Sequence, residues 1–234
     1  MPDTDAFSLE HIVPFFQPIM DLKHDRVWRY ECLARLVTPG EYIFLPNQFL
    51  HLIEREDSVA QFTETMFHRS AEYFRNTSIA WNLNLCEEDI ADDTLFSMLK
   101  RVLDDYPNPN RVGFELTADT AHSDLPRFDH FLNNANALGV NVFLDHFGVA
   151  GDADMALLSR PITGIKIAGS VMSEISDSKQ VRSHVAHLLD AADTQSINVI
   201  AEHIEDEDTL NDIMEIGIGY GQGFYFSTPQ ASAT

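Results

Sequence analysis

The run Val140-Asn141-Val142-Phe143-Leu144 is largely apolar, has the length of a buried strand and ends on the carboxylate of Asp145. The pattern recurs along the chain: residues 78–81 precede Asn82, residues 111–114 precede Glu115, residues 163–165 precede Lys166, and residues 197–201 precede Glu202. An earlier carboxylate, Glu31, lies inside the strand-like stretch 27–33. A buried strand has no use for a charge at its end, whereas the carboxyl ends of strands in a parallel βα barrel form the floor of the active site. The repetition predicts one pocket lined by an Asn, several carboxylates and a Lys.

The order of predicted elements favours an α/β fold, a TIM-like (β/α) barrel. Two strands at residues 15–22 and 27–36, joined by Lys23-His24-Asp25, predict a hairpin. Residues 46–74 show helical spacing of apolar side chains in two segments, and strands alternate with helices from residue 78 onward. Those helices are expected at residues 92–106, 124–138, 152–158, 178–193 and 206–216. Residues 1–12 are predicted to be a short N-terminal leader and residues 13–234 a single barrel domain.

The composition is strongly acidic, with a formal net charge of −22. Such a surface repels the phosphate backbone, which argues against general nucleic-acid binding. An anionic small ligand is compatible with this charge only where local cations such as Arg35, Lys166 or a bound metal ion offset it. The other interpretation of the charge is solubility, and the composition does not separate the two.

The sequence contains no apolar run that approaches the length of a membrane span, and its N-terminus is acidic, unlike a signal peptide. We therefore expect a soluble, cytoplasmic protein with no membrane partner. The two cysteines, Cys32 and Cys86, lie in strand-like segments at a spacing that matches no zinc motif, and we expect both to be reduced.

The order of the motifs resembles the EAL domain family, the bacterial cyclic-di-GMP phosphodiesterases and their inactive relatives. The resemblance runs from Phe16-Gln17-Pro18-Ile19 to Gly221-Gln222-Gly223-Phe224-Tyr225-Phe226, which is most of the chain. The signature tripeptide is Glu31-Cys32-Leu33, with Cys in place of Ala. It is followed by Asn82-Leu83-Asn84, Glu115-Leu116-Thr117-Ala118, Asp145-His146-Phe147-Gly148, Lys166-Ile167-Ala168 and Ala201-Glu202-His203-Ile204-Glu205. The resemblance implies a barrel with one antiparallel strand.

The resemblance also implies a site for Mg²⁺ or Mn²⁺. Its first ion would use four residues, all present here: Glu31, Asn82, Glu115 and Asp145. Oxygen ligands of this kind suit hard divalent cations. The alternative is an unoccupied polar cluster held by its own hydrogen bonds. By the same resemblance, Lys166 corresponds to a lysine near the attacking water. Glu202 corresponds to a carboxylate that contacts the metal ion or the water.

Three positions depart from the family pattern. His146 stands where the family has a second Asp, and Ala168 stands where it has an Asp two residues after the Lys. Ala118 replaces a Glu that steadies the loop after the Asp145 strand, and that loop has itself diverged. His146 is either a substitute ligand or a neutral side chain in a retired position, and we favour the second. Since two-metal hydrolysis needs both ions, these changes predict a degenerate site.

Three residues match ligand-facing positions of the family. Arg35 corresponds to an arginine that pairs with a ligand phosphate, for which a guanidinium fork is well shaped. Gln17 lies where the family contacts a guanine, and Gln222 lies at the last strand end. We hypothesise a regulator in cyclic-di-GMP signalling that binds the nucleotide or a protein partner and performs little or no hydrolysis. The sequence does not determine whether it forms a dimer. The alternatives are an active metal-dependent phosphodiesterase and, more distantly, an enolase-type enzyme that abstracts a proton beside a carboxylate.

Overall fold

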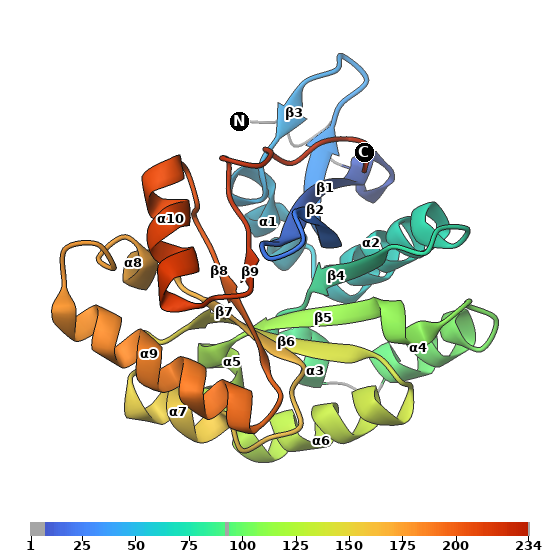
Figure 1. The fold of residues 1–234 in the computed structure, drawn as a ribbon. Coiled ribbons are helices and arrows are strands. Elements are labelled where there is room, and N and C mark those ends of the chain that lie inside the picture. The colour runs from blue at the N-terminus through green and yellow to red at the C-terminus, as the bar shows by residue number, and fades with distance from the viewer. Residues whose placement is uncertain (1–7, 92–93, 234) are drawn as a thin grey trace.

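The computed structural model describes residues 8–91 and 94–233, and over these ranges its strands form a single nine-stranded sheet (Figure 1). The sheet order is β1-β9-β8-β7-β6-β5-β4-β2-β3, and an additional pairing of β1 with β2 closes the ring. The strands are β1 (Ile12–Asp21), β2 (Arg26–Val37), β3 (Ile43–Phe44), β4 (Ala80–Asn84), β5 (Val112–Thr117), β6 (Asn141–Phe147), β7 (Gly164–Ile167), β8 (Asn198–Ala201) and β9 (Tyr220–Gly221).

The ring is a (β/α) barrel in which β1 alone runs against both of its neighbours, β2 and β9. Every other pair of neighbours around the ring is parallel. The short β3 pairs with β2 outside the ring and projects from the body (Figure 1). The predicted TIM-like barrel with one antiparallel strand is therefore confirmed, as is the hairpin of the first two strands.

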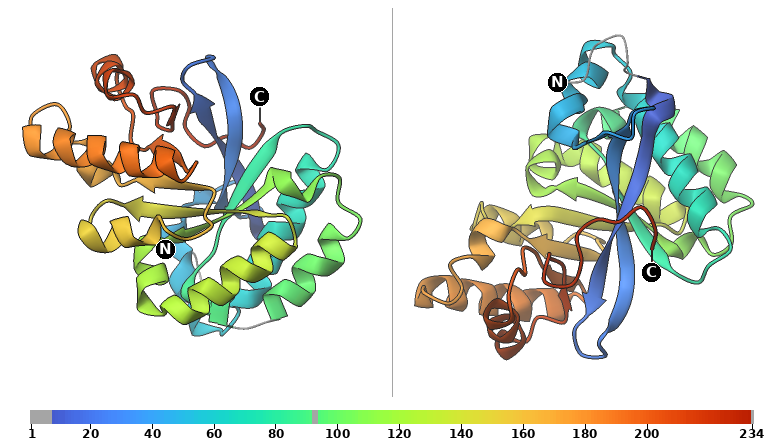
Figure 2. Two further views of the ribbon diagram at one scale, coloured as in Figure 1. Left: turned by 60° about the horizontal axis from the view of Figure 1, so that its bottom comes forward. Right: turned by 90° about the horizontal axis from the view of Figure 1, so that it is seen from above.

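Helices surround the barrel (Figure 2). They are α1 (Pro46–Arg55), α2 (Val59–Phe74), α3 (Glu87–Ala91), α4 (Thr94–Leu103), α5 (Ala118–Ser123), α6 (Leu125–Ala137), α7 (Asp152–Leu157), α8 (Gly169–Met172), α9 (Lys179–Thr194) and α10 (Glu207–Ile216). Side chains cap four of them: Thr117, Asp124, Ser178 and Asp206 each accept a hydrogen bond from a first-turn amide. Across the described residues, no helix has the length and apolar composition of a membrane span.

The short helices α3, α5 and α8 were not predicted, since four to six residues are too few to show a helical period. The helix expected at 92–106 is α4, which ends at Leu103; Asp92 and Asp93 lie outside the described residues. Residues 1–7 of the predicted leader also lie outside them. The remainder of that segment forms a 3-10 helix (Leu9–His11) and the start of β1 at Ile12.

The inside of the barrel is divided into an apolar half and a polar half. Ile19, Phe143 and Ile200 form an apolar cluster at the amino ends of the parallel strands, with Trp28 and Tyr220 packed against it. The ring of Phe143 fits there because β7 has Gly164 beside it: a Cβ on that glycine would lie 2.7 Å from the ring. This cluster closes the floor of the barrel, so the carboxyl ends of the strands are left for polar side chains.

Candidate active site

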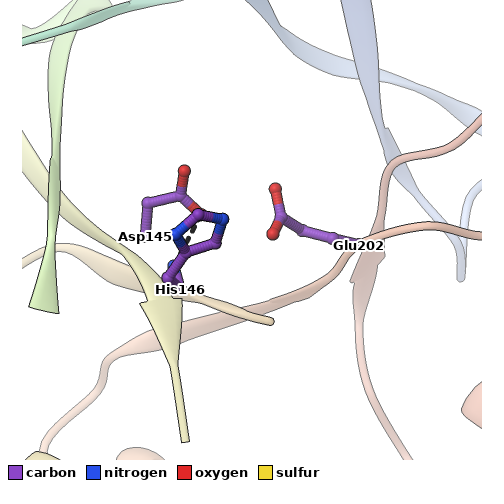
Figure 3. A group of neighbouring side chains, drawn as sticks. All are labelled: Asp145, His146 and Glu202. Atoms are coloured by element: carbon purple, nitrogen blue, oxygen red, sulfur yellow. Dashed lines mark hydrogen bonds between the residues drawn. The ribbon is translucent and has the colours of Figure 1, made fainter. Parts of the chain in front are cut away.

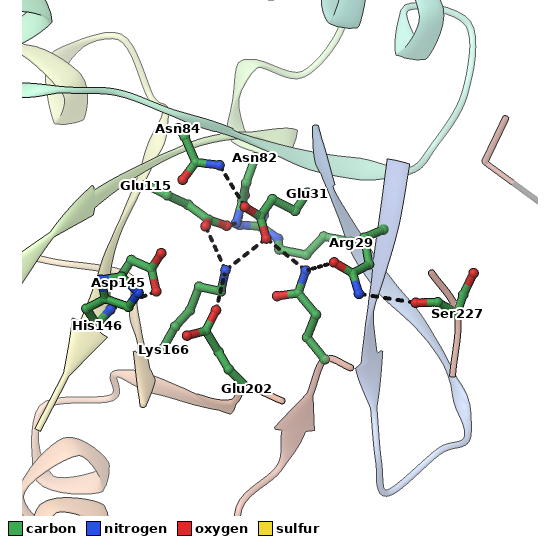
Figure 4. Close-up of polar contacts among 12 residues, drawn as sticks. Arg29, Glu31, Asn82, Asn84, Glu115, Asp145, His146, Lys166, Glu202 and Ser227 are labelled. Atoms are coloured by element: carbon green, nitrogen blue, oxygen red, sulfur yellow. Dashed lines mark hydrogen bonds and ion pairs between the residues drawn. The ribbon is translucent and has the colours of Figure 1, made fainter. Parts of the chain in front are cut away.

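Lys166 stands at the centre of the polar half, held between three carboxylates (Figure 4). Its Nζ lies 2.9 Å from Oε2 of Glu31, 2.9 Å from Oε2 of Glu115 and 3.0 Å from Oε1 of Glu202. Glu31 lies on β2, Glu115 on β5 and Lys166 on β7, and Glu202 directly follows β8. The Lys166 side chain is only 1% exposed, so the ammonium is the counter-ion of a buried carboxylate cluster.

Two asparagines of β4 tie the carboxylates to the barrel wall. Asn82 donates from Nδ2 to Oε1 of Glu115 over 2.6 Å, and Asn84 donates from Nδ2 to Oε1 of Glu31 over 2.7 Å. The oxygen of Asn82 is in turn the acceptor for Arg29, at 2.7 Å from Nη1. The guanidinium of Arg29 lies 4.7 Å from the ring centroid of Trp28 and 4.4 Å from that of Phe143, so it joins the apolar floor to the polar half.

Two glutamines extend the hydrogen-bond network away from Lys166: Gln17 lies on β1, and Gln222 directly follows β9. Gln222 donates from Nε2 to Oε2 of Glu31 over 2.8 Å and lies 3.3 Å from Oε1 of Gln17. Gln17 donates to the carbonyl of Ser227 over 3.1 Å. An open pocket of about 240 Å³ lies above these residues, with Phe224 and Glu202 also in its wall. Gln17 and Gln222 therefore lie where a ligand in this pocket would meet them.

Burial and mutual repulsion set the protonation of the cluster. Burial, and then the charge of Glu31, raise the pKa of Glu115 to about 8. Burial also raises the pKa of Glu202. For Glu31, burial acts to raise the pKa, but Lys166 and three hydrogen bonds outweigh it and lower the pKa. The surrounding carboxylates likewise overcome burial at Lys166 and raise its pKa well above the usual value, so the amine is protonated at neutral pH.

Asp145, His146 and Glu202 face one another at the edge of the cluster (Figure 3). One ligand atom from each lies within 4.8 Å of the others, among the residues that the structure describes. Glu202 also has a buried Oε2 that no hydrogen-bond donor reaches. His146 is exposed and has a positive φ of 53°, and its backbone N–H donates to Oδ1 of Asp145.

The other two departures from the family pattern are buried alanines. Ala168 is 2% exposed and follows β7 as the N-cap of α8, where it offers no ligand atom. Ala118 is 2% exposed and begins α5. Support for the turn after β6 (residues 148–151) comes instead from Asp154 in α7, which accepts hydrogen bonds from the N–H groups of Gly148 and Ala150 at 2.8 and 3.0 Å.

Arg35 lies four residues beyond Glu31 on β2 and on the same face of that strand. It is 8% exposed, donates from Nη1 to the carbonyl of Ala34, and its guanidinium lies 5.6 Å from the ring centroid of Phe15. The charge of Glu31 reaches it, although burial is the larger effect and lowers its pKa. Arg35 does not line the pocket itself, and its pairing with a phosphate stays a prediction.

The sequence pattern missed Arg29, Asn84, His122 and Asp154. Arg29 had a signal, since it precedes Glu31 by two residues and therefore lies on the same face of β2. Asn84 had a signal, since it follows Asn82 by two residues and therefore lies on the same face of β4. His122 and Asp154 lie in short helices with no diagnostic spacing. Both cysteines are free, as predicted.

The donor set fits a divalent cation of the hard class. It consists of carboxylate oxygens around a buried site, and the unpaired Oε2 of Glu202 is an acceptor with no donor. One of the four predicted ligands is turned the other way: Asn82 directs its NH₂ toward Glu115 and its oxygen toward Arg29. Asn82 would have to rotate, and Lys166 would have to share Glu31 and Glu115, for a cation to use this set.

The profile of the EAL domain family matches residues 4–229, and the chain belongs to that family. Cyclic di-GMP phosphodiesterase PdeB of Shewanella oneidensis is 23% identical over 98% of this chain. Cyclic di-GMP phosphodiesterase PA2567 of Pseudomonas aeruginosa is 25% identical over 94% of it. The chain spans only 28% and 38% of the lengths of these two proteins.

Solved structures share the barrel. The FimX EAL domain from Pseudomonas aeruginosa, bound to c-di-GMP, superposes with a TM-score of 0.87 at 22% identity, covering 96% of this chain and 93% of that one. An EAL domain protein from Listeria monocytogenes gives a TM-score of 0.87, also at 22% identity, over 97% and 92% of the two chains. At this identity the likeness establishes the fold.

Proposed function

We propose that this chain is a degenerate EAL domain that acts in cyclic-di-GMP signalling as a nucleotide receptor or a protein-binding regulator, with little or no hydrolysis. The observation that carries the proposal is the buried methyl group of Ala168. It lies two residues after Lys166, where the family supplies a carboxylate, and it is 2% exposed. Alanine cannot bind a metal ion or orient water, so one part of a two-ion site is missing.

The residues that would hold a cation are Glu31, Asn82, Glu115 and Asp145, with Glu202 and His146 beside them. A divalent ion bound there would act as a Lewis acid toward a phosphoryl oxygen. Lys166, paired with Glu31, Glu115 and Glu202, would hold these carboxylates in place beside the ion. His146, with an imidazole nitrogen in place of a carboxylate, suits Mn²⁺ better than Mg²⁺.

The pocket supports nucleotide binding by residues that do not perform hydrolysis. Gln17 and Gln222 offer amide groups in its wall, and Phe224, 61% exposed, offers an aromatic face at its edge. Arg35 is the cation available to a phosphate. A receptor requires these groups and has no need of a carboxylate at position 168. A protein partner, a dimer and a cytoplasmic location are further parts of this proposal.

The alternative is an active, metal-dependent cyclic-di-GMP phosphodiesterase. The ion pairs of Lys166 favour it, because they bring Glu31, Glu115 and Glu202 together on one ammonium. A hydrolysis assay in Mn²⁺ and in Mg²⁺, run beside calorimetry with cyclic-di-GMP, separates the two functions. Binding without turnover supports the receptor. Steady turnover that Glu31→Ala abolishes supports the enzyme and overturns the proposal.

A further inference from the structure

The carboxylate of Asp154 is buried and makes three contacts that the predicted site does not use. It is 1% exposed. Its Oδ2 accepts hydrogen bonds from the backbone N–H groups of Gly148 and Ala150, at 2.8 and 3.0 Å. Its Oδ1 lies 2.8 Å from Nε2 of His122 in α5. One side chain of α7 thus ties the turn after β6 to the helix that follows β5.

The strand that leads into this turn is irregular where it carries the site residues. Between β6 and β7, Leu144 pairs with Ile165 and Phe147 pairs with Ile167. Two residues of β6, Asp145 and His146, therefore stand opposite the single residue Lys166. This is a β-bulge, a device that re-aims side chains beside sites. The β7 ladder does not hold the bulged residues in place.

Backbone conformation adds to the need for an anchor. His146, Gly148 and Gly151 have positive φ values of 53°, 93° and 60°. The left-handed conformation is unfavourable for a residue with a side chain, and it persists where the surroundings enforce it. The carboxylate of Asp154 grips the turn at Gly148 and Ala150, immediately after the bulge, and hydrogen bonds to an ionised acceptor are the strong class.

We propose that Asp154 and His122 are positioning residues: they hold the turn at residues 148–151 closed and thereby aim Asp145 and His146 at the site. The inference rests on the proposed function where it treats Asp145 as a metal ligand. Asp154 fixes the turn, and His122 fixes Asp154 from α5, the helix that directly follows β5, the strand that carries Glu115. The bulge on β6 is in this way connected, through Asp154 and His122, to the segment that follows β5.

The test compares Asp154→Asn and His122→Gln with two matched controls, Asp152→Asn in the exposed first turn of α7 and His187→Gln on exposed α9. Hydrogen exchange should accelerate about 10-fold or more at the amides of Gly148 and Ala150 in Asp154→Asn, because a charged acceptor is lost. His122→Gln should show the same change more weakly. Neither control should alter it. Circular dichroism confirms that each variant is folded.

The second readout is Mn²⁺ affinity by calorimetry, which a purely structural role would leave unchanged in a folded variant. Outer contacts of metal sites typically contribute 10- to 100-fold to affinity, and we expect about 10-fold weaker binding in Asp154→Asn. Unchanged exchange, or faster exchange with an unchanged Mn²⁺ affinity, overturns the inference. If Asp154→Asn does not fold, His122→Gln decides by the same two criteria.

Failure of the proposed function is distinguishable from failure of this inference. If the unaltered chain binds no Mn²⁺, the metal part of the proposed function fails. Hydrogen exchange at the amides of His146 and Phe147 in Asp154→Asn then tests whether Asp154 positions the bulge. Accelerated exchange that spreads from the turn into these residues supports the positioning role, and acceleration confined to Gly148 and Ala150 overturns it.

Discussion

Arg29 donates from Nη1 to Oδ1 of Asn82 over 2.7 Å, and this bond sets which end of the Asn82 amide faces Glu115. With the oxygen occupied, the NH₂ of Asn82 points to Oε1 of Glu115 at 2.6 Å. The guanidinium is 3% exposed and stacks on the aromatic floor of the barrel. The guanidinium of Arg29 thus fixes the orientation of Asn82, a candidate metal ligand. The orientation of this ligand therefore depends on how the apolar floor packs around Arg29.

Gly113→Ala should break this relationship. A Cβ at residue 113 would lie 2.2 Å from Oδ1 of Asn82 and 3.0 Å from Nη1 of Arg29, so both side chains would have to move. Overpacking of this kind costs about 1–3 kcal/mol, which for a chain of this size lowers Tm by about 2–12 °C. Gly219→Ala is the matched control, because no atom lies within 4 Å of its added Cβ. Equal Tm values for the two variants would contradict the assignment.

The metal-free protein should lose stability as pH rises because of Glu115. Its pKa is raised to about 8 in the folded state, so between the ordinary carboxyl value and pH 8 the folded chain binds more protons than the unfolded chain. Its stabilising effect is complete below pH 4.5 and disappears as pH rises through 8. Glu115→Gln, which mimics the protonated carboxyl, should therefore gain up to about 1 kcal/mol per pH unit relative to the unaltered chain. Tm measured in EDTA from pH 5 to 9 checks this, and a pH-independent difference would refute it.

Crystals soaked in Mn²⁺ should show one weakly bound ion near Glu31, Asn82, Glu115 and Asp145. The reason is a set of three carboxylates and one amide, complete once Asn82 rotates, beside a position, Ala168, that supplies no ligand atom. Anomalous diffraction measures the occupancy directly. Two fully occupied ions about 3.5–4 Å apart, the spacing of two-metal enzymes, would contradict this prediction.

Hydrolysis of cyclic-di-GMP should be absent or at least about 10³-fold below the rate of an active family member. Losing ion-stabilised charge removes several kcal/mol of barrier reduction, and each 1.36 kcal/mol is about a factor of ten. The double variant His146→Asp with Ala168→Asp should recover part of the rate. The rate is measured by product analysis in Mn²⁺, with Glu31→Ala as the inactive control. If a folded double variant recovers no activity, the changes at His146 and Ala168 are not the main cause of the lost hydrolysis.

Arg35→Ala should weaken cyclic-di-GMP binding by about 1.5–3 kcal/mol, the contribution of a charge-assisted hydrogen bond to phosphate. Calorimetry with and without divalent metal measures the change. The net charge of −22 opposes a dianionic ligand, so we expect tighter binding with metal present. Arg55→Ala, on exposed α1, is the control for removing a positive charge. An equal effect of both variants would mean that Arg35 acts only through the overall field.

The sequence predicted the barrel because its signals are local. A short apolar run such as residues 140–144 is typical of a buried strand, and Asp124, Ser178 and Asp206 cap helices through amides three residues away. The polar residues at the strand ends could likewise be expected to meet, because parallel strands place their carboxyl ends on one side of a barrel. Lys166, Glu31, Glu115 and Glu202 do meet there.

What the sequence alone determined about this protein is therefore the order of strands and helices and the composition of one polar pocket. Only the tertiary structure decided how those side chains share their partners: that Lys166 pairs with three carboxylates, that Arg29 turns the amide of Asn82, and that Asp154 supports the turn after β6. The physical reason is distance along the chain. Arg29 and Asn82 are 53 residues apart and His122 and Asp154 are 32 apart, so no local periodicity links them, and their contacts exist only once the barrel has closed.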